Sequence, residues 1–435
     1  MRDNDMPMNL HDRAEEVLAQ MRRQGFDAAM VEVSQRSLAE LNVAHDEPTL
    51  MRSTERHKLA LLGLVDGRRA STEADDLGDA AIAVTVAALF AAARSAPQDA
   101  ANAVSTGQVA SIVQGPMAGD ASAMADTMLG MLDHRARQTP TVTIEEASVA
   151  HHRLDAHTVT SGGSSLACQL GWYELMAMGT AREGQHTSSF NASGGQCNGL
   201  DAVDGVPASQ RFGIAQMFAD LARQVHTQPV PQRFVGDVVL TPQALDSLLG
   251  WLRGQLSDMA LISGTSLYRD RVGQAIASPL LSLASRFDAP GVAAISSDGF
   301  ATPPVELLRA GRLMTLTPSL YAARKTGLAQ VPVAAGGWAV AAGETALADV
   351  IAGVKHGAVV GRLSMGTPAA NGDFSGVIKN SFLIEGGQLG PALSEVMVSG
   401  NMAQMLRDVV AVSQERLDTG ATLLPWVRIG GLHFS

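Results

Sequence analysis

The sequence predicts an α+β fold in two domains, and three observations lead to this prediction. The chain has 435 residues, whereas a single hydrophobic core rarely extends beyond roughly 250–300 residues. Its first half mixes helical periodicity with β-like runs, and its second half is richer in glycine and in short β-like runs. We expect an N-terminal helix-and-antiparallel-sheet domain over residues 1–230 and a C-terminal, mostly β domain with a few helices over residues 231–435.

The N-terminal half begins with an amphipathic pattern. Leu10, Val17 and Met21 fall on one face of a helix over residues 10–23, with charged residues on the opposite face. Short β-like runs follow, and the last of them ends at an Asp66-Gly67 turn signal. We expect strands at residues 29–33, 38–44 and 59–65, helices at 77–94, 121–137 and 208–225, further strands within 141–181, and a polar loop at 186–204.

The C-terminal half follows a connector that contains prolines, so we place the domain boundary near residues 226–236. A strand over residues 237–240 runs into Thr241-Pro242, and threonine at the N-cap with proline at the first helical position is a strong helix start. Further strands are expected at residues 357–363, 376–384 and 423–429.

The composition of the chain argues against two classes of partner, nucleic acids and membranes. The net charge is -11 and no run of lysine or arginine forms a basic stripe, so we expect no nucleic-acid partner. The most apolar window, residues 80–93, is shorter than the ~20 residues that a membrane helix needs, so we expect no membrane partner. Two cysteines cannot form a disulfide framework, and the N-terminus lacks an apolar signal segment, which together favour a cytoplasmic protein.

Several common catalytic motifs are missing. A metallopeptidase helix of the H-E-x-x-H kind places two imidazoles on zinc beside a carboxylate, but no histidine in this chain precedes a glutamate. No lysine follows a glycine, as a phosphate-binding Walker A loop requires. The G-x-S-x-G and S-x-x-K patterns of serine nucleophiles are absent as well.

The remaining candidates have ordinary structural explanations. His151 and His152 are adjacent, so in a strand they point to opposite faces; we expect a solvated strand rather than a shared metal ion. Cys168 and Cys197 match no compact zinc spacing, even with His186, and are expected to be free thiols. Asp373 follows a glycine, which favours a turn residue over a catalytic carboxylate.

The second half carries a series of blocks in a recognisable order. These are DVVLTPQALDSLLGWL, ISGTSLYRD, FDAPGVAAISSDGF, LLRAGRLMTLTPSLYAARKTGL, NGDFSGVIKNSFLIEGGQLGPALSEVMVSGNMAQMLRDVVAVS and TLLPWVRIGG. In this order they resemble the TldD/PmbA (TldD/TldE) peptidase family over about the last 200 residues. The first half agrees only in outline, through the GFD segment near Gly25 and the Asp66-Gly67-Arg68 turn.

This resemblance implies a two-domain α+β subunit of a heterodimer that encloses a peptide-binding chamber. In the family, the TldD-type subunit supplies zinc through an H-E-x-x-x-H helix and a later cysteine, and the PmbA/TldE-type subunit lacks both. The corresponding helix here, residues 244–252 (ALDSLLGWL), has no histidine, and residues 418–421 offer no thiol. The resemblance therefore implies a metal-free PmbA/TldE-type subunit, no cofactor in this chain, and zinc in a TldD-like partner.

The expected role is to form part of the peptide-binding chamber, with no catalytic and no metal-binding residues. One alternative keeps the heterodimer but lets it cleave a modified small molecule or a peptide conjugate in a biosynthetic pathway. Another is a stand-alone binding or scaffold protein. The candidate substrate contacts are polar residues of three C-terminal segments: Ser263, Ser266, Tyr268, Arg324, Lys325, Asn371, Asp373 and Ser375.

Overall fold

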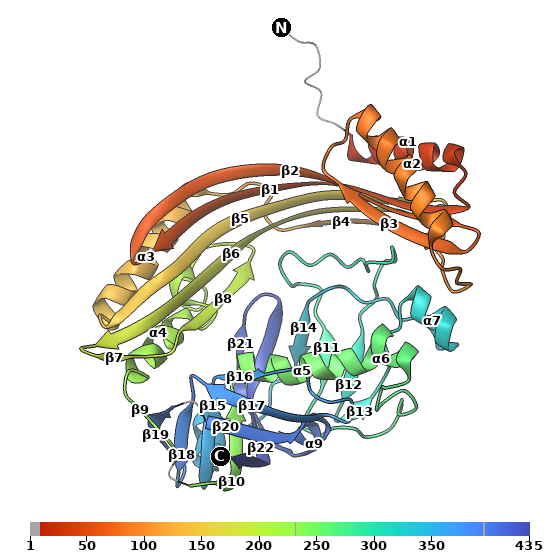
Figure 1. Cartoon of the computed structure of the whole chain (residues 1–435). Helices are drawn as coiled ribbons and strands as arrows, with labels where there is room; N and C mark the ends of the chain where they lie inside the picture. The colour runs from red at the N-terminus through yellow and green to blue at the C-terminus, as the bar shows by residue number, and fades with distance from the viewer. Residues whose placement is uncertain (1–8, 231, 395) are drawn as a thin grey trace.

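The computed structural model describes residues 9–230, 232–394 and 396–435, which form two sheets. An eight-stranded sheet from the N-terminal half has the order β3-β2-β1-β5-β6-β4, with β7 and β8 also paired to β6. In Figure 1 this sheet arches over the C-terminal half, which is built on a 14-stranded sheet. The α+β class expected from the sequence is confirmed.

The arch consists of long antiparallel strands and short edge strands. β1 and β2 are paired almost from end to end, with one register shift between Asn42 and Val43. The two separate strands expected at residues 29–33 and 38–44 are therefore one strand, and β4 was not expected at all. The polar segment expected as a loop contains β7 and β8. The strands are β1 (Ala28–Ala44), β2 (Glu47–Val65), β3 (Arg68–Ala74), β4 (Val109–Gln114), β5 (Val142–Thr160), β6 (Ser165–Glu183), β7 (His186–Thr187) and β8 (Asn191–Cys197).

Helices cover the outer face of the arch at its two ends (Figure 1). At one end α1 and α2 pack on alternate residues of β1 and β2 such as Val31, Val33 and Leu59; at the other, α3 and α4 pack on β5 and β6. The helix expected over residues 208–225 is interrupted at Gly213, which has a φ of 79°. The helices are α1 (Leu10–Gln24), α2 (Asp79–Ser95), α3 (Ala121–Gln138), the short 3-10 helix η1 (Ala208–Gln210) and α4 (Ile214–Arg223).

The second sheet has its core around α5 (Pro242–Leu256). Thr241 caps this helix by accepting a hydrogen bond from the Ala244 amide, and Pro242 is its first residue, which confirms the expected helix start. The strands of the second sheet are β9 (Thr227–Gln228), β10 (Phe234–Leu240), β11 (Leu283–Ser285), β12 (Glu306–Arg309), β13 (Arg312–Leu313), β14 (Trp338–Val340), β15 (His356–Val360), β16 (Arg362–Met365), β17 (Asp373–Lys379), β18 (Phe382–Glu385), β19 (Gln388–Leu393), β20 (Val396–Asn401), β21 (Val409–Asp418) and β22 (Thr422–Phe434). Its further helices are α6 (Asp258–Ser263), α7 (Leu320–Thr326), α8 (Leu347–Ala352) and α9 (Met402–Arg407).

The two halves touch at several places. The inner face of the arch packs Ala156, Leu170 and Trp172 against Ala293 and Ile295 of the C-terminal half. The turn between β21 and β22 reaches β8, where the Gln196 amide donates to the Thr419 carbonyl at 2.9 Å. The expected boundary near residue 230 stays a prediction; β9, which begins at Thr227, already pairs with β19 of the second sheet.

No helix in the described part of the chain is long and apolar enough to span a bilayer.

Candidate functional site

The solvent-facing side of α5 carries a stripe of three residues. Ser247, Trp251 and Gly254 are spaced four and three positions apart, so they lie on one face of the helix. The opposite face buries leucines in the core, among them Leu245 and Leu252. The amphipathic pattern of α5 therefore turns this stripe away from the sheet.

A groove of about 690 Å³ runs along this stripe. Its other walls are Ser257, Met259 and Ala260 around the start of α6, Thr265, and the loop that follows β16. The lining is mainly apolar, with two methionines, Met259 and Met365, whose flexible side chains adapt to varied shapes. None of these groove residues was singled out from the sequence, although the spacing of Ser247, Trp251 and Gly254 opposite the leucines was a usable signal.

Two neighbours hold Trp251 in place. The ring of Tyr268 meets the indole edge to face, with 6.1 Å between ring centroids. Gly372 also lies against the indole, because a Cβ at this position would be 3.2 Å from it. Gly372 also has a φ of 92°, a conformation that side chains with a Cβ rarely adopt.

The loop beside Gly372 is fixed by amide and carboxylate groups. Asp373 accepts hydrogen bonds from the side-chain amides of Asn401, at 2.8 Å, and Asn371, at 2.7 Å. These bonds lower the pKa of Asp373 below its usual value. Asn401 also caps α9 by accepting from the Gln404 amide. Asp373 is thus the hydrogen-bonded first residue of β17, directly after the turn at Asn371, and its contact with substrate stays a prediction.

The other candidates in this region lie around the groove rather than inside it. The Ser263 hydroxyl donates to the Met259 carbonyl at 2.7 Å, and the Ser266 hydroxyl accepts from the Tyr268 amide at 3.1 Å, so both serines shape the chain after α6. Tyr268 is buried, its hydroxyl has no hydrogen-bond partner, and burial raises its pKa to about 12. Ser375 is exposed on β17, opposite Ser399 of β20.

Arg324 and Lys325 lie elsewhere, at the contact between the two halves. Lys325 pairs with Asp99 at 2.8 Å, and Arg324 donates to the Asn102 carbonyl at 3.1 Å. Tyr321 of the same helix donates its hydroxyl to Asp99 at 2.8 Å. The hydrogen bond from Lys325, with those from the Ala101 amide and Tyr321, lowers the pKa of Asp99 to about 2. The structure therefore brings two of the three predicted segments to the α5 groove and places the third between the halves.

The residues of the α5 groove do not fit a zinc ion. Zinc in proteins is bound by cysteine sulfur, histidine nitrogen or carboxylate oxygen, and the groove lining contains none of these side chains. Within residues 9–230, 232–394 and 396–435 no cluster of three or more His, Cys, Asp or Glu residues is arranged to hold a metal. Asp418, in the segment where the resemblance implies a cysteine ligand, instead pairs with Arg286 at 2.8 Å.

The expectation for the two adjacent histidines was half right. Their side chains do point to opposite faces, but both are buried, so the solvated strand was wrong. His151 lies against the segment before α3, with its Nε2 2.8 Å from the Pro116 carbonyl, and His152 stacks on Trp172 with ring centroids 4.9 Å apart. Secondary elements cover both faces of β5 at this point.

Both cysteines are free and buried, as expected. Burial raises the pKa of Cys168 to about 11, and it raises the pKa of Cys197 as well. Neither thiol is therefore prepared to act as a nucleophile near neutral pH. His186 instead contacts His226, with 4.7 Å between ring centroids.

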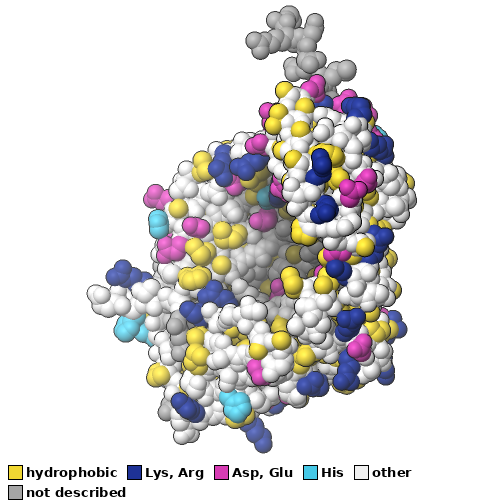
Figure 2. All heavy atoms as spheres, turned by 45° about the vertical axis from the view of Figure 1, so that its right-hand side comes forward, with side chains coloured by type: hydrophobic (Ala, Val, Ile, Leu, Met, Phe, Trp, Pro, Cys, Tyr) yellow, Lys and Arg dark blue, Asp and Glu magenta, His cyan; other side chains and the backbone are white. Residues whose placement is uncertain are grey.

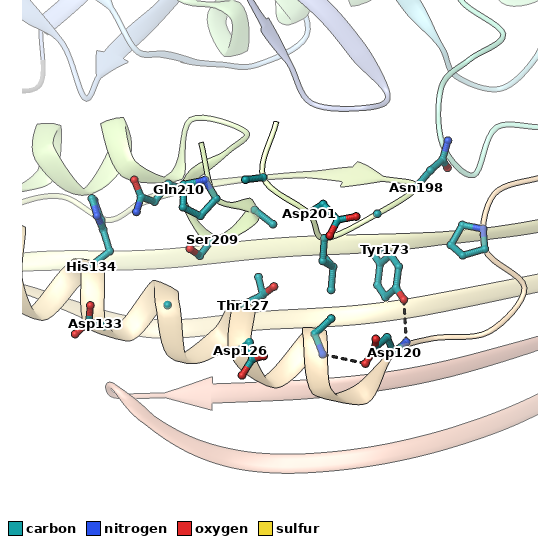
Figure 3. Close-up of a pocket in the computed structure, with 18 of the residues that line it drawn as sticks. Asp120, Asp126, Thr127, Asp133, His134, Tyr173, Asn198, Asp201, Ser209 and Gln210 are labelled. Atoms are coloured by element: carbon teal, nitrogen blue, oxygen red, sulfur yellow. Dashed lines mark hydrogen bonds between the residues drawn. The ribbon is translucent and has the colours of Figure 1, made fainter. Parts of the chain in front are cut away.

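A second groove, of about 710 Å³, lies between α3 and residues 198–210 (Figure 3). Its lining includes four carboxylates, of which two have structural partners: Asp120 caps α3, and Asp133 pairs with Arg137 at 2.8 Å. The Tyr173 hydroxyl accepts a hydrogen bond from the Asp120 amide. His134 has no hydrogen bond to a lining hydroxyl, so no nucleophile is paired with a base here. The groove beside α5 remains the better candidate.

Comparison with known proteins agrees with the two-sheet fold. Residues 233–435 match the family model for the PmbA/TldA metallopeptidase C-terminal domain. The chain is 25% identical over 227 residues to the metalloprotease PmbA of Escherichia coli O157:H7, a match that covers 49% of this chain and 50% of the relative. A PmbA homolog of Haemophilus influenzae is 25% identical over 228 residues, 48% of each chain. The chain thus spans about half the length of the curated relatives it matches.

Solved structures extend the likeness of fold to nearly the whole chain. TldE from Thermococcus kodakarensis superposes with a TM-score of 0.81 at 16% identity, covering 97% of this chain and 100% of that one. A protein described as a proposed modulator of DNA gyrase from Bacteroides thetaiotaomicron gives a TM-score of 0.83 at 20% identity, with 98% of each chain covered. One with the same description from Thermotoga maritima gives 0.78 at 16% identity, covering 98% of this chain and 100% of that one.

The fold is therefore that of a metallopeptidase-like, two-sheet α+β protein. Residues 233–435 carry a domain of the PmbA/TldA metallopeptidase family, and the fold of the whole chain is similar to that of TldE.

Proposed function

We propose that the chain is the metal-free subunit of a heterodimeric, zinc-dependent peptidase, and that it forms one wall of a chamber for extended peptides in the cytoplasm. A TldD-like partner would supply the zinc. The observation that carries this proposal is the partly exposed stripe of α5 formed by Ser247, Trp251 and Gly254, which lines a groove without metal ligands. A subunit built in this way contributes binding surface rather than the reactive centre.

The arch supplies a second feature that suits an extended peptide. Along residues 47–58, β2 pairs with β1 on one side only, because β3 begins its pairing at Leu59. Within the described residues this leaves an open sheet edge with free backbone groups. An extended peptide can add to such an edge through main-chain hydrogen bonds, which depend little on its sequence.

Mixing experiments test the proposal. The purified chain, a purified TldD-like protein with an H-E-x-x-x-H motif, and their mixture should each be assayed for cleavage of an unfolded peptide. We expect that only the mixture cleaves the peptide, and that this cleavage is lost when a chelator removes the zinc. Cleavage by this chain alone that a chelator does not affect would contradict the proposal.

A groove-blocking variant tests the site. Ala370 is exposed on the rim of the α5 groove, so A370W should fill the groove without disturbing the core. Ala83, exposed on α2, provides the matched control A83W. We expect A370W to lower the activity of the mixture while both variants unfold at the same temperature; equal activities would exclude the groove from the site.

The alternatives give different results in the same experiments. Assembly with the partner but no peptide cleavage would favour a complex that acts on a modified small molecule or a peptide conjugate. A chain that remains a monomer or a homodimer in the presence of TldD-like proteins would favour a stand-alone binding protein.

A further inference from the structure

The inner face of the arch lines a hollow above the C-terminal half (Figure 2). On this face two arginines from neighbouring strands stand directly opposite each other. Arg36 of β1 pairs in register with Arg56 of β2, and residues that are opposite in an antiparallel pair point to the same face. The alternate residues of these strands, such as Val33 and Leu59, pack under α1 and α2 on the outer face.

This arginine pair has no internal counter-charge. Like charges placed directly opposite across two strands destabilise a sheet. Neither guanidinium forms an ion pair with a carboxylate of the described residues, and both side chains are exposed. Arg36 instead contacts the Nδ1 atom of His152, at 3.4 Å, and the ring of Trp172, whose centroid is 5.6 Å away. The two exposed guanidiniums are therefore available to an anion from outside the chain.

Arg36 lies beside a flat surface formed by two aromatic rings. The rings of His152 and Trp172 are stacked with an interplanar angle of 11°, and both residues are buried. Burial lowers the pKa of His152, and the nearby charge of Arg36 lowers it as well. Glu174 and Glu40 act in the opposite direction and raise it. The neighbouring His151 acts in the lowering direction. The positive charge of the site near neutral pH thus comes from the two arginines.

The cavity around the pair is large and electrically asymmetric. It has a volume of about 1180 Å³ and includes both arginines in its lining. Five acidic residues also line it, against three basic ones: Glu32, Glu55, Glu73, Asp75 and Asp76. Of these, Glu73 pairs with Lys58 at 2.7 Å. Glu32 lies four positions from Arg36 along β1, about 13 Å at the ordinary rise of a strand. The arginine pair is therefore the positively charged part of a cavity that also contains acidic side chains.

We propose that Arg36 and Arg56 form a binding site for a carboxylate of an extended peptide, a role that rests on the peptide-binding function proposed above. A guanidinium presents parallel donors that match the two oxygens of a carboxylate. Arg56 also lies within the open edge of β2, and a strand added to this edge turns every second side chain toward the inner face. The carboxylate comes from an Asp or Glu side chain of the peptide or from its C-terminus.

Three labelled peptides separate these two sources. Each peptide has eight residues, of which one near the middle is varied and the other seven are Thr, Val or Ser. The first has a central Asp and an amidated C-terminus, the second a central Asn and an amidated C-terminus, and the third a central Asn and a free C-terminal carboxylate. Binding to the full chain is measured by fluorescence anisotropy at low ionic strength, where exposed charges are least screened.

We expect the first or the third peptide to bind about tenfold more tightly than the neutral one. The double variant R36Q/R56Q should lose this preference and keep its affinity for the neutral peptide. The matched control R23Q/R94Q removes two exposed arginines from the helices of the outer layer, and it should bind like the original chain. R56E places a carboxylate opposite Arg36, so it should also lose the preference for a peptide carboxylate.

Three results overturn the inference. Equal affinities of the original chain for all three peptides would exclude a carboxylate site and leave the peptide-binding function intact. Failure to bind any of the peptides would also exclude the site, and peptide cleavage by the mixture of subunits would then judge the proposed function independently. A preference for the acidic peptides that survives in R36Q/R56Q would place the carboxylate elsewhere.

Discussion

Replacing Tyr268 by phenylalanine should stabilise the C-terminal half of the protein. The side chain is 4% exposed and its hydroxyl has no hydrogen-bond partner. Burying an unpaired polar group costs ~1–3 kcal/mol, whereas the ring of phenylalanine keeps the same contact with Trp251. We therefore expect Y268F to raise the free energy of unfolding by ~1 kcal/mol, the lower end of that range, because the hydroxyl also loses some packing contacts when it is removed.

Urea denaturation measures this change. Trp251 lies beside Tyr268, so tryptophan emission follows unfolding of the region concerned, and the midpoint should shift to higher urea at unchanged slope. In the mixed complex, cleavage should stay unchanged, because Tyr268 does not line the groove. A fall in cleavage together with a stable fold would show that the hydroxyl contacts substrate, as the sequence pattern suggested.

The other two tyrosines of the chain provide controls of opposite sign. The Tyr321 hydroxyl donates to Asp99, and the Tyr173 hydroxyl accepts from the Asp120 amide, both at 2.8 Å. Y321F and Y173F each break a formed hydrogen bond, so each should lower stability by ~1 kcal/mol. If Y268F destabilised the protein as much as these two variants, the hydroxyl of Tyr268 would have a partner and the reasoning would fail.

Three further outcomes are expected from other parts of the chain. In the folded protein the pKa of Asp99 is about 2, below the ordinary value of 3.8, so the stability that Asp99 contributes is present above about pH 4 and is lost as the pH falls toward 2. The urea midpoints of D99N and the original chain should therefore differ at pH 6 and converge at low pH. A difference that stays constant with pH would contradict this. G372A forces a side chain into a positive φ beside Trp251, so it should cost ~1 kcal/mol or more and shift tryptophan emission; an unchanged midpoint and spectrum would refute the strain. Cys168, with a pKa of about 11, should react with a thiol reagent at pH 8 only after unfolding, and fast labelling of the native protein would show that it is accessible.

Local sequence signals predicted the elements whose causes are local. The helix over Leu10–Gln24 followed from its apolar face, and the start of α5 followed from Thr241 and Pro242. The continuous strand β1 was missed because Gln35, Arg36 and Ser37 read as a polar break. One face of this strand lines an open hollow, so polar residues continue the strand there instead of ending it.

Long-range packing explains what the sequence could not predict. β4 is a short strand between two helices, and only its parallel pairing with β6 defines it. His151 and His152 were expected in solvent because nothing in their neighbourhood in sequence shows that Pro116 and Trp172 cover them. In the candidate site, the turn residues on the rim were found by composition, whereas Trp251 was hidden in a helix that reads as ordinary core.

Lys325 belongs to a contact between the arch and the C-terminal half. Lys325 was expected to touch substrate, but it pairs with Asp99 and so helps to fix one end of the arch above the C-terminal half. A second contact, between Gln196 and Thr419, lies on β8 of the arch. Because these contacts set the spacing between the two walls of the hollow, loosening one of them should affect every peptide alike.

D99N tests this distinction against the arginine pair. It keeps the shape of the side chain but removes the charge that attracts Lys325. We expect D99N to weaken binding of the acidic and the neutral peptides by the same factor, whereas R36Q/R56Q weakens only the acidic ones. If D99N changed the preference for a carboxylate, its charge would act on the ligand directly; if it changed neither affinity, the spacing of the walls would depend on the remaining contacts between the halves.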